Sequence, residues 1–406
     1  MSYSLIKAYA FSRHLLVVIL LTLGLIGCSS SDDEEDQSEL VAELIDINEK
    51  FSPKVLWSRS VGDGVDDFFS RLKPTVAYNK VFSASREGDV VAFDEKTGDK
   101  IWSVDLSNIK NERGFFEGRR SAQLSGGPVT GINQVFIGNE NGNVYALSAE
   151  TGDLIWQGKV KGEIITAPAF DSGILVVNSA SGILKAFNAV TGEDLWEVEQ
   201  DVPALTLRGL SAPTIASGGV IIGENNGNVS VYILESGQQG WVAEIGESSG
   251  TTELERVIDV DATPVIFGDK LYAISSRGNL AAIELRTGRL IWKRQYSSYR
   301  ELSLDGNNIF LTNKRGHIFS INRIDGVEQW SNLSLTNRGV TGAAIVDNYL
   351  VVGDAEGYLH WLEQETGDIV ARYHVDGSGI YTEPAVHDNI LYTQSRDGDL
   401  EAITSR

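Results

Sequence analysis

Side chains arranged for covalent catalysis are scarce in this 406-residue chain. Gly246–Gly250 (GESSG) matches the G-x-S-x-G pattern, in which a serine at a strand-to-helix turn serves as the nucleophile of a hydrolase. That motif needs a packed helix after it, whereas here the polar run Thr251–Glu253 follows. The match is therefore interpreted as a coincidence, and Ser248 is not predicted to be catalytic.

Ligands for metals or cofactors are equally sparse. The single cysteine, Cys28, excludes thiolate metal sites and cysteine nucleophiles. No histidine has the spacing of a metal motif, and His317 and His360 are expected to be half-exposed strand residues. Asp397–Asp399 resembles a calcium loop, but it occupies a recurring turn position. The sequence thus predicts no catalytic residue, no metal and no cofactor.

A long-range repeat of glycines decides the fold class. Eight glycines each open a short apolar run: Gly88, Gly142, Gly182, Gly227, Gly278, Gly316, Gly357 and Gly398. In seven repeats a second glycine follows ten residues later: Gly98, Gly152, Gly192, Gly237, Gly288, Gly326 and Gly367. Apolar runs of four to six residues alternate with Asn-Gly, Asp-Gly and Thr-Gly pairs, which is typical of short antiparallel strands joined by tight turns. An array of similar β-units is expected.

Proline and tryptophan also recur at fixed distances from these glycines, and each such set of equivalent positions is called a column here. Six prolines lie 14 residues before the first glycine: Pro74, Pro128, Pro168, Pro213, Pro264 and Pro384. Six tryptophans lie four residues after the second glycine: Trp102, Trp156, Trp196, Trp241, Trp292 and Trp330. A tryptophan at a fixed place in each unit predicts that neighbouring sheets pack through it, because this side chain buries a large area.

The two ends of the array predict how it closes. The last repeat stops at Arg406, before its tryptophan strand, whereas an extra tryptophan strand, Val55–Trp57, precedes the first repeat. The prediction is an all-β fold, an eight-bladed β-propeller of four-stranded antiparallel blades over residues 52–406. The N-terminal strand is expected to pair with the last blade and close the ring. A β-helix is the alternative, but its coils are usually shorter than these repeats.

The N-terminus predicts export and lipidation. Residues 1–27 carry Lys7 and Arg13 before an apolar stretch, which is the layout of a secretory signal. Leu25–Cys28 (LIGC) resembles the bacterial lipobox, which implies lipid attachment at Cys28; an ordinary signal with a chance cysteine is the alternative. Residues 28–51 are predicted to be a flexible tether. Because the next residue is not aspartate, the resemblance implies the periplasmic face of the outer membrane of a Gram-negative bacterium.

Charge limits the choice of partners. The formal net charge is −22, and removal of the signal, which contains Lys7 and Arg13 but no acid, makes the mature chain still more negative. Such a surface argues against nucleic acid as a partner and against adsorption to anionic lipid. Membrane attachment is therefore expected through the lipid anchor alone.

Unequal connections between repeats are candidate binding sites. The longest lie between a tryptophan and the next proline column: Ser103–Gly127, Glu197–Ala212 and Val242–Thr263. The second contains Leu205, Leu207 and Arg208, and the third contains Asp259 and Asp261 at alternate positions. Exposed leucines and an arginine near acids suggest an interface anchor. The alternative is that the leucines are buried under their own loop and Arg208 pairs internally with one aspartate.

The repeat itself resembles the tryptophan-docking repeat of the PQQ-like quinoprotein family over residues 52–406. Enzymes of that family bind their quinone with a vicinal cysteine pair, a catalytic aspartate and calcium ligands. A chain with one cysteine cannot form the pair, so this resemblance implies a propeller that acts as a binding body and is not an enzyme. A quinoprotein oxidoreductase and a periplasmic glycan-binding propeller remain the alternatives.

More specific motifs resemble the BamB family of outer-membrane assembly lipoproteins: Pro203–Pro213 (PALTLRGLSAP), Asp259–Pro264 (DVDATP), Asn279–Arg294 and Val351–Trp361. The resemblance implies a scaffold of the β-barrel assembly (BAM) complex that binds a POTRA domain of BamA, with other BAM subunits and unfolded outer-membrane proteins as further partners. It also implies the partner-binding residues Leu205, Leu207, Arg208, Asp259 and Asp261. Whether such a scaffold orients BamA or offers strand edges to clients is left open.

Overall fold

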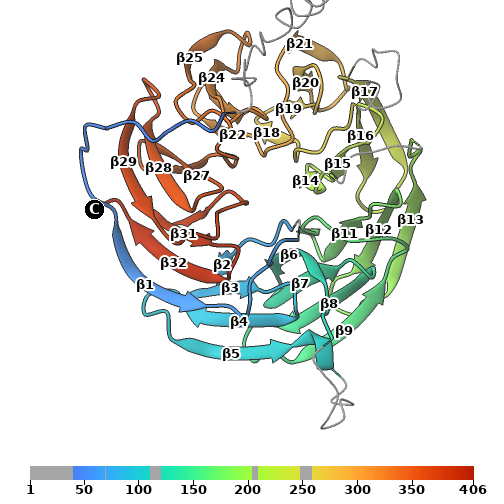
Figure 1. The fold of residues 1–406 in the computed structure, drawn as a ribbon. Coiled ribbons are helices and arrows are strands. Elements are labelled where there is room, and N and C mark those ends of the chain that lie inside the picture. The colour runs from blue at the N-terminus through green and yellow to red at the C-terminus, as the bar shows by residue number, and fades with distance from the viewer. Residues whose placement is uncertain (1–39, 69, 110–119, 204–208, 247–257) are drawn as a thin grey trace, which may run out of the picture. The chain divides into compact units, whose positions relative to one another are not determined.

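Each sequence repeat forms one four-stranded antiparallel sheet in the computed structural model, which describes residues 40–68, 70–109, 120–203, 209–246 and 258–406. Eight such sheets stand as blades around a central axis in this part of the chain (Figure 1). Blade 1 comprises β2 (Thr75–Ala77), β3 (Lys80–Ala84), β4 (Asp89–Asp94) and β5 (Lys100–Asp105), and blade 2 comprises β6 (Leu124–Gly131), β7 (Gln134–Asn139), β8 (Asn143–Ser148) and β9 (Leu154–Lys159). Blade 3 comprises β10 (Ala169–Asp171), β11 (Ile174–Asn178), β12 (Ile183–Asn188) and β13 (Asp194–Glu199), and blade 4 comprises β14 (Thr214–Ala216), β15 (Gly219–Gly223), β16 (Asn228–Ile233) and β17 (Gln239–Glu244). Blade 5 comprises β18 (Val265–Phe267), β19 (Lys270–Ile274), β20 (Leu280–Glu284) and β21 (Leu290–Arg294), and blade 6 comprises β22 (Ser303–Asp305), β23 (Asn308–Thr312), β24 (Ile318–Asn322) and β25 (Glu328–Asn332). Blade 7 comprises β26 (Ala344–Val346), β27 (Tyr349–Gly353), β28 (Tyr358–Glu363) and β29 (Ile369–His374), and blade 8 comprises β30 (Ala385–His387), β31 (Ile390–Gln394), β32 (Asp399–Thr404) and β1 (Lys54–Ser60).

The predicted ring closure is confirmed. Strand β1 pairs antiparallel with β32, from Lys54 opposite Thr404 to Ser60 opposite Asp399, and so supplies the outermost strand of blade 8. Backbone hydrogen bonds thus join the two ends of the propeller. The eight-bladed, all-β prediction is also confirmed. In the described residues the only helix is the short 3-10 helix η1 (Leu106–Asn108), and no helix there is long and apolar enough to cross a membrane.

The core consists of eight apolar clusters, one at each junction between neighbouring blades of the described structure. In β7, for example, Ile137 faces blade 1 while Phe136 faces blade 3, because successive strand residues point to opposite faces of a sheet. Both faces of the middle strands are therefore buried. This double burial explains why their sequences are continuously apolar and do not alternate.

The tryptophan and second-glycine columns meet across the blade junctions, as the repeat predicts. Trp57 of blade 8 lies over Gly98 of blade 1, where an added Cβ would come within 2.6 Å of the indole ring. Its ring nitrogen donates to the carbonyl oxygen of Glu95 at 3.0 Å. The same indole-to-carbonyl bond recurs from Trp102, Trp156, Trp196, Trp241, Trp292 and Trp330 to the next blade. A side chain larger than that of glycine would prevent this packing.

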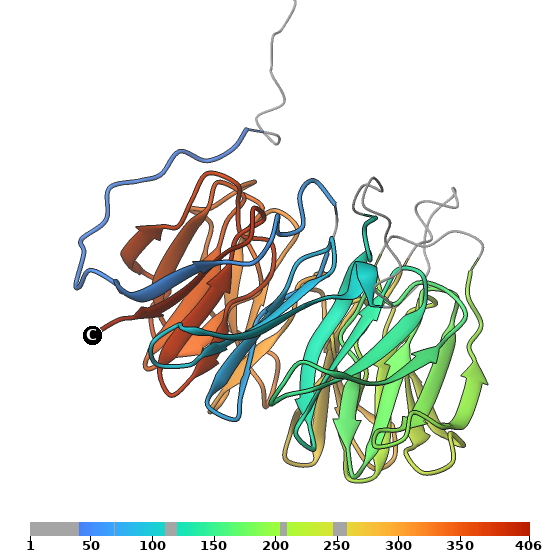
Figure 2. The same cartoon turned by 90° about the horizontal axis from the view of Figure 1, so that it is seen from below.

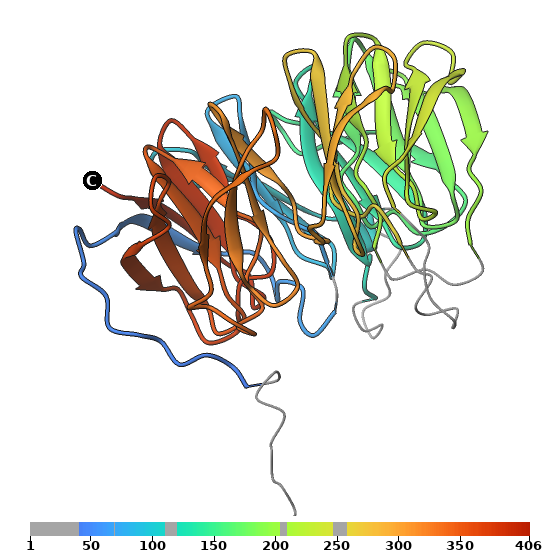
Figure 3. The ribbon, with the colours of Figure 1, turned by 90° about the horizontal axis from the view of Figure 1, so that it is seen from above.

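Residues 41–51 differ from the flexible tether predicted up to residue 51. They pass along the outside of blades 6 and 7, in blue in Figures 2 and 3. Leu44 and Ile47 pack on the cluster between blades 6 and 7, and Phe51 packs on the next cluster. Partial burial of these three side chains holds the segment. The sequence did not reveal this because apolar residues three and four apart also fit a helix.

Two arginines, one in the β25–β26 connection and one in β29, fasten this segment through its backbone. Arg338 donates to the carbonyl oxygen of Ala42 at 3.0 Å, and Arg372 donates to that of Ile45 at 3.2 Å. Arg338 is itself held by an ion pair with Asp354 at 2.7 Å, in which both side chains are almost completely buried. The segment therefore rests on a charged pair inside the propeller.

His360 differs from the half-exposed strand residue predicted from the sequence, because its side chain is fully buried. Its Nε2 lies 3.0 Å from Asp354, and its Nδ1 accepts a hydrogen bond from Arg372 at 3.3 Å. Because Nδ1 accepts, the ring proton is assigned to Nε2, which donates to the aspartate. Burial lowers the pKa of His360, with Asp354 opposing the shift. The histidine is therefore a neutral link between two charged groups.

Candidate functional site

The residues predicted to bind a partner divide into two groups. Leu205, Leu207 and Arg208 lie outside the described residues, as do the lipid-attachment residue Cys28 and Ser248 of the rejected nucleophile motif. Asp259 and Asp261 are described, and both side chains are buried, with exposed fractions of 0% and 1%. The two aspartates do not form an open acidic surface. They are buried parts of the β17–β18 connection itself.

The two predicted connections meet at the base of these motifs. Gly209 directly follows the segment 204–208, and a Cβ added to it would come within 2.4 Å of both carboxylate oxygens of Asp261. Two residues later, the carbonyl oxygen of Ser211 accepts a hydrogen bond from Asn178 of β11 at 3.1 Å. The β13–β14 and β17–β18 connections are therefore packed on each other where both approach the axis of the ring.

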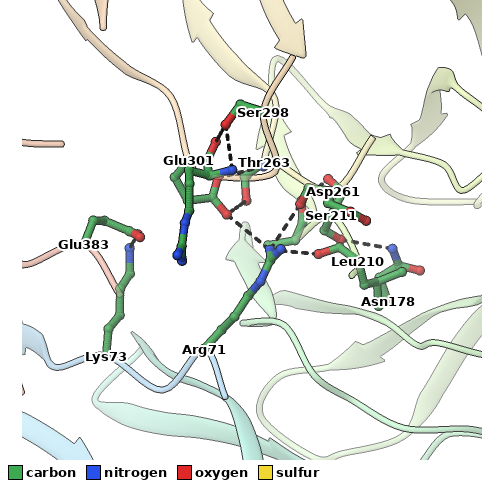
Figure 4. A network of polar contacts seen from close by, with 12 residues as sticks. Arg71, Lys73, Asn178, Leu210, Ser211, Asp261, Thr263, Ser298, Glu301 and Glu383 are labelled. Atoms are coloured by element: carbon green, nitrogen blue, oxygen red, sulfur yellow. Dashed lines mark hydrogen bonds and ion pairs between the residues drawn. The ribbon is translucent and has the colours of Figure 1, made fainter. Parts of the chain in front are cut away.

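An arginine from the opposite side of the ring joins the same cluster (Figure 4). Arg71 lies in the connection between β1 and β2, and its guanidinium donates to the carbonyl oxygens of Leu210 at 3.0 Å and Asp261 at 3.1 Å. It also pairs with Glu301 at 3.3 Å. Glu301 in turn accepts from the backbone nitrogen of Thr263 at 2.7 Å. One guanidinium thus links four connections of the ring.

A second ion pair, between Lys73 and Glu383, lies nearby in the channel (Figure 4). The attraction of Glu383 raises the pKa of Lys73. Burial would raise the pKa of Glu383, but Lys73 brings it below its ordinary value, so both groups are charged at neutral pH. For Glu301, burial outweighs the effect of Arg71 and the pKa is raised.

The sequence analysis missed these channel residues, although one signal marks them. Lys73, Glu301 and Glu383 each stand immediately before the proline column. The other five repeats have Gly127, Ala167, Ala212, Thr263 and Gly342 at that place. Three charged residues at a position that is otherwise occupied by small residues indicate that this position faces the channel, where the charged groups form ion pairs.

These groups line a cavity of about 960 Å³ at the axis. Its wall includes Tyr299 and Tyr381, with the guanidinium of Arg300 4.9 Å from the first ring and that of Arg396 4.8 Å from the second. Arg396 also pairs with Asp67 at 2.6 Å. Aromatic and cationic groups do converge here, as the glycan-binding alternative requires, but the protein's own groups already engage both arginines. The geometry does not favour that alternative.

One cluster among the described residues has the spacing of a metal site. The Nε2 atom of His387 lies 3.6 Å from a carboxylate oxygen of Glu95 and 3.9 Å from one of Asp388. His387 and Asp388 are 43% and 84% exposed, however, and exposed acidic groups of this kind are common without a metal. We assign no metal to this cluster.

Asp261 should make stability depend on pH. Burial raises its pKa from 3.8 to about 7, with Asp259 adding to the rise, Arg71 opposing it and Glu301 adding less. Between about pH 4 and pH 7 the folded chain therefore holds a proton that the unfolded chain has released, and stability falls as pH rises through this window. At about 1.4 kcal/mol per pKa unit, the loss amounts to at most roughly 4 kcal/mol.

Replacing Asp261 by asparagine should flatten this fall and raise the free energy of unfolding at pH 8. Urea denaturation at pH 5 and pH 8 measures the effect, with the exposed Asp305→Asn as the control. The same pH dependence in Asp261→Asn and the wild type would contradict the assignment.

Comparisons with known proteins agree with the fold and name a family. A family described as "Outer membrane protein assembly factor BamB" matches residues 42–111 and 86–332. The Shewanella oneidensis protein of that name is 43% identical over 395 residues, covering 97% of this chain and 99% of its own length. The Escherichia coli K12 protein of that name is 39% identical over 393 residues, covering 97% and 99%.

Solved structures show the same ring. The crystal structure of BamB from Moraxella catarrhalis superimposes with a TM-score of 0.76 at 24% identity, covering 87% of this chain and 99% of that one. The quinohemoprotein alcohol dehydrogenase from Comamonas testosteroni gives a TM-score of 0.64 at 14% identity, covering 89% and 78%. At these identities the likeness concerns the fold alone. It transfers no quinone chemistry to this chain.

Proposed function

We infer the function of this chain from its family, because the chain belongs to the BamB family of outer membrane protein assembly factors. These relatives are assembly factors and not enzymes, and the chain is accordingly a non-catalytic member. We propose that it is a scaffold of the BAM complex that binds a POTRA domain of BamA and assists the folding and insertion of outer-membrane proteins. The 43% identity to the Shewanella oneidensis protein over 97% of the chain carries this proposal.

The proposed contact with BamA is the segment that contains Leu205, Leu207 and Arg208. Arginine is among the residues that most often dominate a protein interface, and the two leucines beside it would add apolar contact area. The packing of Gly209 on the carboxylate of Asp261 supports a shared base for the two connections. Because Asp259 and Asp261 are buried, we propose that they support the contact from beneath it.

We also propose that Cys28 carries the lipid and holds the propeller at the periplasmic face of the outer membrane. A signal-like N-terminus that ends in the only cysteine of the chain supports this anchor. Several acyl chains on one cysteine give stable attachment, whereas a single chain binds reversibly. Mass spectrometry of the purified chain should therefore find Cys28 as the acylated N-terminal residue.

Contact with unfolded clients is proposed through the outer rim of the ring. The outermost strands of several blades expose an aliphatic residue just before their tryptophan: Leu56, Ile101, Ile155, Leu195 and Ile291. An outermost strand has a free edge, and an extended peptide can add to such an edge through backbone hydrogen bonds. The exposed aliphatic side chains would add apolar contacts to the incoming strand.

Loss of binding in a surface variant tests the docking proposal. Leu205→Asp combined with Leu207→Asp should abolish co-purification with BamA, because two charges would have to be buried in an apolar contact. The melting temperature should stay at the wild-type value, because the proposal makes both leucines contact residues for the partner. The control is Val190→Asp, which adds a charge at a 58% exposed residue in the β12–β13 turn. Undiminished recovery of BamA with the double variant would contradict this docking site.

A further inference from the structure

We propose that Arg71, inside the channel, is a positioning residue for the docking surface, an inference that rests on the proposed contact through residues 205–208. Arg71 belongs to the connection that follows the ring-closing strand β1, whereas residues 205–208 belong to the β13–β14 connection. Its side chain is only 18% exposed. It contacts no partner itself, and it acts by holding the backbone on which the contact is built.

The hydrogen bonds of Arg71 fall at the ends of both docking connections. Leu210, whose carbonyl oxygen accepts at 3.0 Å, is two residues from Arg208. Asp261, whose carbonyl oxygen accepts at 3.1 Å, is the second of the two aspartates predicted for partner binding. Both acceptors are backbone oxygens, so these bonds hold the position of the backbone whatever side chains residues 210 and 261 have. A change at Arg71 would therefore move the base of both connections together.

Glu301 gives this arrangement its rigidity. It pairs with Arg71 at 3.3 Å and also accepts from the backbone nitrogen and the hydroxyl group of Thr263, at 2.7 and 3.1 Å. Thr263 follows Asp261 by two residues, so the β17–β18 connection is held from both sides of the ion pair. All three contacts of Arg71 are made by one nitrogen, Nη1, at the far end of the arginine side chain, so the length of that side chain places the donor. A lysine side chain keeps the charge but is one bond shorter, so its nitrogen would not lie at the same position.

The neighbouring ion pair supplies a matched control within the same channel. Lys73 lies two residues after Arg71 and pairs with Glu383, which precedes β30 of blade 8. The only hydrogen bond described for its ammonium group goes to Glu383, and none reaches a docking connection. Both cations neutralise an acid in the channel, but only Arg71 touches the chain beside the docking motifs. Effects due to channel charge alone should thus appear in Lys73 variants too.

The test compares the affinity of full-length variants for the purified periplasmic domains of BamA. Arg71→Ala should weaken binding about 10- to 100-fold, because it loses a few positioning hydrogen bonds and each tenfold change in affinity corresponds to about 1.4 kcal/mol. Lys73→Ala should bind within about twofold of the wild type. Hydrogen exchange should rise in residues 209–212 and 259–263 of Arg71→Ala while the blade strands stay protected. Wild-type affinity in Arg71→Ala, or an equal loss in Lys73→Ala, would overturn the inference.

A second variant decides the case if Arg71→Ala lowers the melting temperature. Arg71→Lys keeps the positive charge beside Glu301 but shortens the side chain by one bond, which withdraws the donor from the carbonyl oxygens of Leu210 and Asp261. Its binding should be weaker than wild type and stronger than that of Arg71→Ala; wild-type affinity would overturn the inference. Leu207→Asp, measured alongside, separates the two proposals. If Leu207→Asp binds normally the docking site itself is wrong, whereas a loss in Leu207→Asp with normal binding by both Arg71 variants rejects only the role of Arg71.

Discussion

Trp57→Ala is expected to lower the free energy of unfolding by about 3–5 kcal/mol, the usual range for removing a buried tryptophan. Trp57 is 5% exposed and packs at the junction that closes the ring, with ring centroids 5.9 Å from Tyr392 and 6.2 Å from Phe93. Its loss would leave a cavity between blades 8 and 1 and would remove the hydrogen bond to Glu95. Strand β1 would then be held mainly by its pairing with β32.

Denaturation in guanidinium chloride, followed by tryptophan fluorescence and circular dichroism, measures this effect. Leu56→Ala is the matched control, because Leu56 is the preceding residue of the same strand and is 49% exposed. A change within about 0.5 kcal/mol is expected for such a surface position. If Trp57→Ala proved as stable as Leu56→Ala, the closing strand would contribute little to the ring.

Asp354→Ala should cost a similar amount, about 3–5 kcal/mol, because it removes the buried counter-ion of Arg338 and leaves the more exposed Glu356 as the remaining ion-pair partner. Asp354 is fully buried and accepts from Arg338 at 2.7 Å and from His360 at 3.0 Å. Burial would raise its pKa, but hydrogen bonds from His360 and from the backbone of Tyr358, with Arg338, lower it below the ordinary value. The carboxylate is therefore charged throughout the neutral range.

A double-mutant cycle separates the charge effect from general damage. Arg338→Ala with Asp354→Ala should lose less stability than the sum of the two single changes, because the double variant contains no unpaired charge from this pair. Asp354→Ala should also speed hydrogen exchange at Lys50, whose backbone nitrogen donates to Val370 at 2.9 Å, because Arg338 fastens the same segment at Ala42. Strict additivity, with unchanged exchange at Lys50, would contradict this view of the network.

The ring could be predicted from the sequence because each repeated residue has the same structural role in every blade where it occurs. A second glycine such as Gly98 leaves room for the preceding blade's tryptophan, and a tryptophan such as Trp57 reaches the next blade's carbonyl. Both depend only on neighbouring units, so their period is visible in one chain. Closure followed from the count of tryptophan strands at the two ends.

The channel and the outer segment could not be predicted in the same way. Arg71 contacts residues 139 and 190 positions away, and no local pattern predicts such pairs. Leu44 and Ile47 have a helix-like spacing, yet they pack on blades as part of an irregular segment. Asp259 and Asp261 were predicted to be partner-binding residues, but their alternate positions do not reveal that both carboxylates are buried.

Site-specific photo-crosslinking tests docking through residues 205–208 most directly. A photoreactive amino acid at Leu207, and in a separate variant at Val190 on the β12–β13 turn, would be activated in intact cells. We predict a crosslink to BamA from position 207 and none from position 190. A crosslink to BamA from position 190, with none from position 207, would contradict the proposed orientation of the propeller on its partner.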